Sequence, residues 1–183
     1  MIHEVVKYLF ELGQLKRVKR SGWWLTGVRD PESVAEHSYR TAIIAVILAK
    51  LEGADAGKAA LLALLHDGAE TRVNDMHHLG KSYVDWSGVE EQVLEDQVGA
   101  LPAPLGQTIR SLSAEGRDLN SAEAQIAKDA DHLEWLFQAR EYSREGADVA
   151  EWVQTALNSV KTVSARAIAE LAVEADPNDW RAS

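Results

Sequence analysis

Hydrophobic residues recur at helical spacing along almost the whole chain, and no long stretch alternates strictly between apolar and polar positions. Apolar residues three or four positions apart share one face of a helix, whereas strict alternation with β-branched residues is typical of a strand. The pattern therefore predicts an all-α protein, a helical bundle of about six to eight helices.

Clear local signals mark the first three expected helices. One covers roughly residues 2 to 13 and ends at a glycine. The next has a well-defined start, because Ser33 and Glu36 have the spacing of a capping box, and it continues through the apolar run YRTAIIAVILAKL. The third begins near Asp55, a suitable N-cap, and its leucines lead up to His66.

Helical periodicity continues to near the end of the chain. A long helix is expected from Asn120 to about Ser143, because Asn120 and Glu123 have capping spacing and apolar residues follow at helical intervals. Shorter helices are expected at residues 88–99, 102–115, 148–158 and 159–175.

Length and composition fit one folded unit. The chain has 183 residues, of which 46% are hydrophobic, and this is enough to enclose one sizeable core. No repeat, low-complexity tract or linker divides the sequence. We expect a single domain over residues 1–183, with a core at about 12–143 and cover helices at about 148–175.

Charge and cysteine content exclude several classes of protein. The chain has no cysteine, which rules out disulfides, thiolate zinc sites and cysteine nucleophiles. Its net charge of -10 argues against nucleic acid polymers and anionic membrane surfaces as partners. The sequence shows no secretion signal, and no segment approaches the roughly 20 apolar residues that cross a bilayer. We expect a cytoplasmic protein.

One loop carries a local excess of positive charge, in the stretch KRVKRSGWWLTGVRDPES. Two interpretations are open. The loop is either a solvated connection whose Trp23 and Trp24 pack onto the core, or a site for an anion. Its basic residues are Lys16, Arg17, Lys19 and Arg20.

Four ionisable residues fall where solvation is expected to be poor. They lie at the start of a buried helix, at the end of a leucine-rich helix and beside the apolar seam of the long helix: His37, His66, Asp67 and Asp131. Burying each group is costly without a partner, and one divalent metal ion would satisfy all four. Imidazole and carboxylate donors suit Mn, Co, Zn or Fe.

The spacing of these residues does not identify a metal site by itself. The gaps between them match no short-range ligand rule. Taken singly, each histidine or aspartate is more often a hydrogen-bonded core or surface residue than a ligand. A satisfied core network in a non-catalytic helical protein is therefore an alternative interpretation.

Four blocks of sequence appear in order over about residues 12–143: LKRVKRSGWW, RDPESVAEHSYRTA, LLALLHDGAE and KDADHLEWLFQAREY. Together they resemble the HD-domain metal-dependent phosphohydrolases, and in particular the branch that contains the 5'-deoxynucleotidases. In that superfamily a histidine, a His-Asp pair and a distant aspartate hold the metal. The matching residues are His37, His66, Asp67 and Asp131.

The resemblance also implies two catalytic carboxylates. A glutamate three residues after the HD aspartate matches Glu70, and an aspartate further along matches Asp75. Glu70 would orient or deprotonate the attacking water, while Asp75 would protonate the leaving sugar oxygen or hold the sugar. The exchange of these two roles is an alternative.

The resemblance gives the basic loop a purpose. An arginine before the first ligand histidine holds the substrate phosphate in that branch, and it matches Arg20 here, with Lys19 or Arg17 as alternatives. Trp23 or Trp24 would then pack against the sugar or the base of the substrate.

The function implied by the resemblance is hydrolysis of 2'-deoxyribonucleoside 5'-monophosphates to deoxynucleosides and phosphate, by a homodimer that binds one divalent metal ion. The same site would also suit a phosphodiesterase or a phosphatase for another small phosphate ester. A non-catalytic metal-binding or scaffold protein is the alternative from another class. His77 and His78 are candidates for a second metal, although they follow a turn signal among polar residues.

Overall fold

The computed structural model describes residues 1–182, and the chain is 75% helical, with no strand among those residues. Eight of the ten α-helices have seven residues or more, so the predicted all-α class is confirmed. The elements in order are α1 (Ile2–Leu12), η1 (Gly13–Lys16), η2 (Ser21–Thr26), α2 (Val34–Glu52), α3 (Ala56–Leu65), α4 (Glu70–Val73), α5 (His78–Lys81), α6 (Trp86–Val98), α7 (Ala103–Asp118), α8 (Ala122–Arg144), α9 (Ala150–Ser159), α10 (Val163–Glu174) and η3 (Asp179–Ala182).

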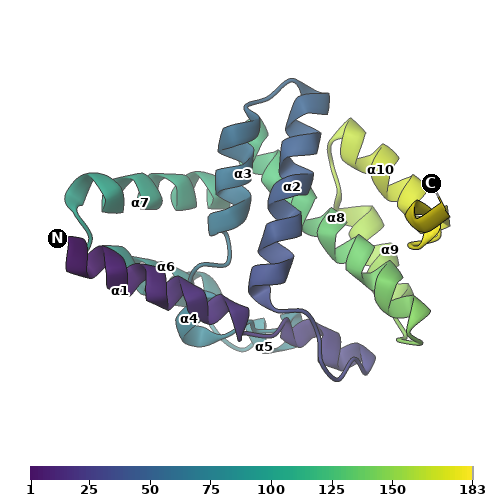
Figure 1. The fold of residues 1–183 in the computed structure, drawn as a ribbon, viewed down its shortest axis with the longest axis horizontal. Coiled ribbons are helices and arrows are strands. Elements are labelled where there is room, and N and C mark those ends of the chain that lie inside the picture. The colour runs from purple at the N-terminus through teal and green to yellow at the C-terminus, as the bar shows by residue number, and fades with distance from the viewer. Residues whose placement is uncertain (183) are drawn as a thin grey trace.

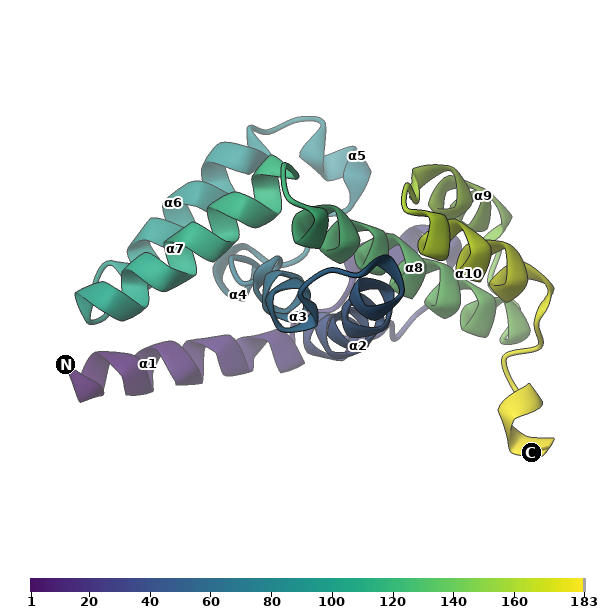
Figure 2. The ribbon, with the colours of Figure 1, turned by 90° about the horizontal axis from the view of Figure 1, so that it is seen from above.

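Helices α2, α3 and α8 form the centre of the molecule (Figure 1). Helices α9 and α10 pack along one side of α8, whereas α1, α6 and α7 extend away on the other side (Figure 2). This arrangement places the start of α2, the end of α3 and the middle of α8 near one another.

Leucine and alanine side chains hold the three central helices together. Leu48 of α2, Leu62 of α3 and Leu133 of α8 are buried in one cluster. Alanines such as Ala45 and Ala130 are fully buried between them, and their small side chains let the helices approach closely. Each buried leucine contributes roughly 1.5–3 kcal/mol relative to an exposed one.

Capping residues set the helix starts near the centre. The predicted capping box of α2 is present, because Ser33 Oγ accepts from the Glu36 amide while the Glu36 carboxylate accepts from the Ser33 amide. Asp55 caps α3 as predicted. The predicted N-cap of α8 is wrong by one residue, since Ser121 and not Asn120 accepts the capping hydrogen bond.

The polar segment after α3 contains the short helices α4 and α5, which the apolar periodicity does not indicate. Asp129 of α8 is fully buried and accepts hydrogen bonds from the amides of Lys161 and Thr162, so it ties the turn before α10 to α8. No helix within residues 1–182 has the length and apolar character needed to cross a bilayer.

Candidate active site

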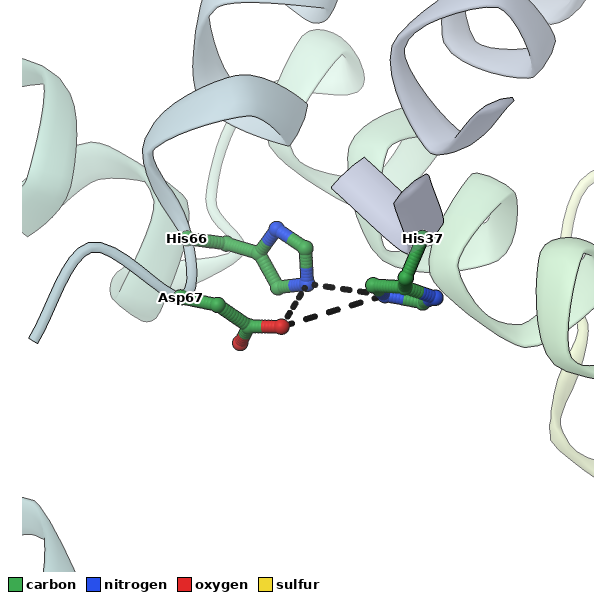
Figure 3. A group of neighbouring side chains, drawn as sticks. All are labelled: His37, His66 and Asp67. Atoms are coloured by element: carbon green, nitrogen blue, oxygen red, sulfur yellow. Dashed lines mark hydrogen bonds and ion pairs between the residues drawn. The ribbon is translucent and has the colours of Figure 1, made fainter. Parts of the chain in front are cut away.

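Two histidines and an aspartate meet where α2 begins and α3 ends (Figure 3). His37 lies in the first turns of α2, His66 ends α3, and Asp67 follows it in the turn. His66 Nε2 lies 3.4 Å from His37 Nε2 and 3.1 Å from Asp67 Oδ2. The donor atoms of the three residues lie within 4.8 Å of one another. They are therefore close enough to share one ion.

Asp131 reaches the same point from α8. Its Oδ1 atom lies 3.2 Å from His37 Nε2 and 3.8 Å from His66 Nε2. Its other oxygen accepts from Lys128 Nζ at 2.8 Å. The structure thus brings two imidazoles and two carboxylates from three helices and one turn to a common centre.

The hydrogen bonds of the imidazoles show that this centre fits a cation. His37 Nδ1 lies 2.5 Å from Glu134 Oε2, and His66 Nδ1 lies 2.6 Å from the carbonyl oxygen of Ala63. Both partners are acceptors, so each Nδ1 carries a proton, and the neutral form of each ring has its lone pair on Nε2. Two such lone pairs that face each other repel unless a positive charge lies beside them.

Electrostatics at the centre favour positive charge strongly. Burial lowers the pKa of His66, but Asp67 and Asp131 outweigh it and hold the pKa well above its ordinary value. Burial raises the pKa of Asp67, but His66 and Arg20 outweigh it and hold the pKa below its ordinary value. Burial also raises the pKa of Asp131, but Lys128 and His37 outweigh it and hold the pKa well below its ordinary value. Both carboxylates therefore stay ionised at neutral pH and available to a divalent metal.

The donor set restricts the kind of metal without selecting one. Two imidazole nitrogens and two carboxylate oxygens are ligands that Zn, Mn, Co and Fe all accept. The predicted cofactor, one divalent metal ion, agrees with this cluster.

Glu134 is a residue of this centre that sequence reasoning missed. It is fully buried on α8, one helical turn after Asp131, and contacts His37 from the side opposite the other donors. Burial raises the pKa of Glu134, but contacts with His37 and Arg40 outweigh burial and lower the pKa overall. The only available signal was its three-residue spacing from Asp131, which places both on one face of α8.

Glu70 stands at the start of α4, three residues after Asp67, and is only 1% exposed. Neither carboxylate oxygen has a hydrogen-bond partner among residues 1–182. Burial, together with the charges of Asp67 and Asp75, raises the pKa of Glu70 to about 10. A buried carboxyl group without partners is costly, and such groups cluster at functional sites.

The segment that carries Glu70 is anchored from two other helices. Gln97 of α6 donates through Nε2 to the carbonyl oxygen of Gly68 at 3.1 Å and to Thr71 Oγ1 at 2.8 Å. Glu11 of α1 accepts from Gln97 at 2.8 Å and from Thr71 at 3.2 Å. These contacts fix the turn between α3 and α4, and with it the position of Glu70.

Arg20 and Asp75 lie together at the edge of the centre. Arg20 Nη1 lies 3.3 Å from Asp67 Oδ2 and 3.8 Å from Asp75 Oδ1. The amide of Ser21 donates to Asp75 Oδ2 at 2.5 Å. Burial lowers the pKa of Arg20, but Asp67 and Asp75 outweigh burial and raise it, so the guanidinium stays charged beside the donors.

The alternatives to Arg20 have other partners. Lys19 Nζ pairs with Asp30 at 2.7 Å and donates to the carbonyl oxygen of Pro31 at 2.8 Å. Arg17 is exposed and donates to Gln14 at 3.3 Å. Arg20 is therefore the basic residue of the loop that the structure places at the centre.

A cavity of about 1000 Å³ opens beside the centre, and Arg20, His66, Asp67, Asp75 and Asp131 lie in its wall. The same wall includes a group of aromatic and polar side chains: Trp23, Trp86, His132, Trp135 and Trp152. This volume is in the usual range for small-molecule sites.

The two candidate tryptophans of the loop have different environments. Trp23 is only 2% exposed, its ring stacks on Trp152 at 4.9 Å, and its Nε1 donates to Glu32 at 3.0 Å. Trp24 is 53% exposed and is not part of the cavity wall. Trp23 is thus a fixed part of the wall.

His77 and His78 line the cavity but do not gather with carboxylates. His77 caps α5 by accepting from the amide of Gly80, and the ring of His78 lies edge-on to Trp152. Within the part of the chain that the structure describes, neither belongs to a group of three residues that could hold an ion. The geometry therefore gives no support to a second metal at these histidines.

Comparison with known proteins gives an independent result. The family model described as HD domain matches residues 12–174. The 5'-deoxynucleotidase HDDC2 of Bos taurus is 35% identical over 139 residues, which cover 75% of this chain and 67% of the relative. The Homo sapiens protein of the same name is 35% identical over 141 residues, covering 75% and 68%.

A solved structure agrees in fold. A conserved hypothetical protein from Pyrococcus furiosus is 33% identical, covers 92% of this chain and 97% of its own, and superposes with a TM-score of 0.77.

Proposed function

The chain belongs to the HD domain family, and from this membership we propose that it is a metal-dependent 5'-deoxynucleotidase that converts 2'-deoxyribonucleoside 5'-monophosphates to deoxynucleosides and phosphate. Relatives at about 35% identity over three quarters of the chain carry that name, which supports the reaction and the substrate class. The observation that carries the proposal is the meeting of His37, His66 and Asp67 within 4.8 Å, beside Arg20 and an open cavity.

We propose that His37, His66, Asp67 and Asp131 hold the metal. The distances between their donor atoms and the free Nε2 lone pairs support this assignment. When bound, a divalent ion supplies Lewis acidity that polarises a phosphate oxygen and makes a water molecule more acidic.

Arg20 is assigned to the substrate phosphate. Its guanidinium is charged, lies in the cavity wall and stands 3.3 Å from Asp67, so a phosphate at the centre comes within its reach. A planar, forked donor matches two phosphate oxygens at once and offsets the charge that develops during displacement. Asp75 holds Arg20 and the Ser21 amide in place.

Glu70 is assigned to proton transfer. Its carboxyl group has no competing hydrogen bonds among residues 1–182, and its pKa of about 10 keeps a proton available at neutral pH. Asp75, by contrast, already forms an ion pair with Arg20 and accepts from a backbone amide, which suits a positioning role better than proton donation. This assignment gives Glu70 the proton-donating role that follows from exchanging the two expected roles, and it gives Asp75 no proton-transfer role.

Trp23 is assigned to the wall that faces the sugar and the base. Its ring is held by stacking on Trp152 and by an edge contact with Tyr142 at 5.1 Å. A rigid aromatic wall gives contact area at little cost in conformational entropy, which supports a role in shaping the site.

A nucleotide screen tests the proposed function. Protein reconstituted separately with Zn, Mn, Co or Fe is incubated with ribonucleoside and 2'-deoxyribonucleoside 5'-monophosphates, with 3'-monophosphates and with a cyclic phosphodiester, and released phosphate is measured. We expect release from the 5'-deoxynucleotides above all others. Turnover of the diester alone would make the protein a phosphodiesterase, and inertness toward every ester with metal bound would make it a binding protein.

We also propose a homodimer that forms through an apolar stripe on α2. Tyr39, Ile43, Ile47 and Leu51 recur every fourth residue, and their side chains are 47–70% exposed. An i, i+4 ridge of this kind packs well into the same ridge of a second copy. Sedimentation of Ile47→Glu, compared with Lys50→Glu beside it, tests the proposal, and a wild-type monomer at micromolar concentration would contradict it.

Two further proposals concern organisation and location. We propose one domain for residues 1–183, supported by the core cluster that joins α2, α3 and α8 to α9 and α10. We propose a cytoplasmic location, supported by a composition without cysteine that suits a reducing compartment. Fractionation of the source cells tests the location.

A further inference from the structure

His37 presents its two ring nitrogens to different surroundings. Nε2 faces the proposed metal donors, at 3.4 Å from His66 and 3.2 Å from Asp131. Nδ1 faces away and lies 2.5 Å from Glu134 Oε2. His37 and Glu134 are both fully buried, so water does not compete for this contact.

The second oxygen of Glu134 is occupied as well. Arg40 donates to Glu134 Oε1 from Nε at 2.9 Å and from Nη2 at 2.8 Å. Arg40 is itself held by Glu141 at 2.6 Å and by Gln138 at 2.9 Å. Helix α2 thus supplies His37 and Arg40 one turn apart, and both contact the buried carboxylate of Glu134 on α8.

The proton of His37 follows from these contacts. Arg40 has only donors, so it keeps Glu134 ionised, and an ionised carboxylate only accepts. The neutral imidazole must therefore carry its hydrogen on Nδ1 and its lone pair on Nε2. A metal ion requires that lone pair.

We propose that Glu134, held by Arg40, is the positioning residue of His37: it keeps the proton on Nδ1 and aims Nε2 at the ion. This inference rests on the proposed metal site, because it assigns an ion to the Nε2 side of the ring. It adds two residues to the machinery, neither of which touches the substrate cavity.

The same residues could instead form a second metal site, since donor atoms of Glu32, His37 and Glu134 also lie within 4.8 Å of one another. The contacts argue against it. The 2.5 Å between Nδ1 and Oε2 is a hydrogen-bond distance, whereas two donors that lie about 2 Å from one tetrahedral ion are about 3.3 Å apart. Glu32 is also engaged by Trp23.

The decisive variant is Glu134→Gln. Arg40 can pair only with the amide oxygen, which turns the amide NH₂ toward His37 Nδ1 and drives the ring proton to Nε2, where the ion must bind. We expect affinity for Zn or Co, measured by competition with a chromophoric chelator, to fall about 10-fold to 100-fold. Unchanged affinity in the folded variant would overturn the inference.

Two matched controls separate positioning from general damage. Glu141→Gln removes another partner of Arg40 without touching His37, and its affinity should equal that of the wild type. Glu32→Gln tests the second-site alternative and should also leave affinity unchanged. A loss in Glu32→Gln as large as that in Glu134→Gln would overturn the inference in favour of a metal ligand role.

A rescue variant adds a signature that structural damage does not produce. In the double variant Glu134→Gln, Arg40→Met, the amide is free to turn its oxygen toward Nδ1, so metal affinity should recover relative to Glu134→Gln alone. No recovery in the folded double variant would contradict the proposal.

A spectroscopic measurement carries the test if Glu134→Gln does not fold. At a pH high enough to make the ring neutral, the ¹⁵N shifts of His37 in the metal-free wild type should show its single proton on Nδ1, and a neutral ring with its proton on Nε2 would overturn the inference. Failure of the proposed function is recognised separately, because Asp67→Ala would then retain its ion. If Asp67→Ala loses the ion and Glu134→Gln keeps it, the positioning role of Glu134 is wrong and the proposed metal site stands.

Discussion

His37 and Glu70 are both buried ionisable residues next to the same donor cluster, and they differ in how the protein treats them. His37 is fully buried and contacts partners through both ring nitrogens. Glu70 is 1% exposed, yet neither of its oxygens has a partner among residues 1–182. His37 and its partner Glu134 thus have every polar atom of their side chains in contact with a partner, whereas Glu70 is an unpaired acid.

The difference separates residues that hold the proposed metal from a residue that takes part in the reaction. A ligand must keep one tautomer and one orientation, so it benefits from a complete network such as that of His37, Glu134 and Arg40. A proton-transfer group must change its protonation state, so fixed hydrogen bonds to one state would slow it. The unpaired acid carries a cost in stability, which is expected where function demands it.

The largest expected effect comes from removing a donor. Asp67→Ala deletes the carboxylate that contacts His66 and Arg20. We expect elemental analysis to find no bound metal in this variant, and phosphate release to fall below detection. Asp118→Ala, at an exposed carboxylate of α7, is the matched control. Full metal content in Asp67→Ala would remove this residue from the ligand set.

Glu70→Gln should change the rate of the reaction without changing metal binding. The isosteric amide keeps the volume but cannot transfer a proton, so we expect normal metal content and a kcat lower by about 10²-fold to 10⁴-fold. Glu91→Gln, at an exposed position of α6, serves as the control. A kcat equal to that of the wild type would exclude Glu70 from the chemistry, and loss of metal would show that it belongs to the holding side.

Arg20→Met should weaken phosphate binding more than metal binding. Charge-assisted hydrogen bonds contribute roughly 1.5–3 kcal/mol, so KM for the nucleotide and the inhibition constant of inorganic phosphate should rise about 10-fold to 100-fold. Arg17→Met removes an exposed arginine from the same loop and should leave both constants unchanged. Similar constants for the two variants would move the phosphate contact away from Arg20.

The last prediction concerns the stability of the metal-free protein and not its activity. The pKa of Glu70 is about 10, against an ordinary value of 4.5, so the folded state keeps a proton that the unfolded chain releases. Wild-type stability should therefore fall as pH rises from about 4.5 toward 10, by up to about 1.4 kcal/mol per pH unit relative to Glu70→Gln. Urea unfolding of both proteins near pH 5 and near pH 8 measures this difference. An equal change in the free energy of unfolding with pH in the two proteins would contradict the prediction.

The helical framework was predictable because its signals are local. The capping box at Ser33 and Glu36, the N-cap Asp55 and the apolar periodicity all act within one or two helical turns, and the structure contains each of them. The cap of α8 was harder, because Asn120 and Ser121 are adjacent and both are good caps; only the backbone geometry decides between them.

The family was predictable from four ordered blocks, and the HD domain match over residues 12–174 confirms it. The roles of individual site residues stay predictions that the variants above test. Glu134 was out of reach of sequence reasoning, because its partner His37 lies 97 positions away and only the packing of α2 on α8 joins them. The burial of Trp23 likewise depends on Trp152 of α9, another contact between distant segments.

Anomalous diffraction from crystals grown with one of the candidate ions tests the central claim most directly. The account predicts a peak within bonding distance of His37 Nε2, His66 Nε2, Asp67 and Asp131, with Glu134 still hydrogen-bonded to Nδ1 of His37. A peak elsewhere, such as beside His77 and His78 or between Glu32 and Glu134, with none at the four donors, would contradict it.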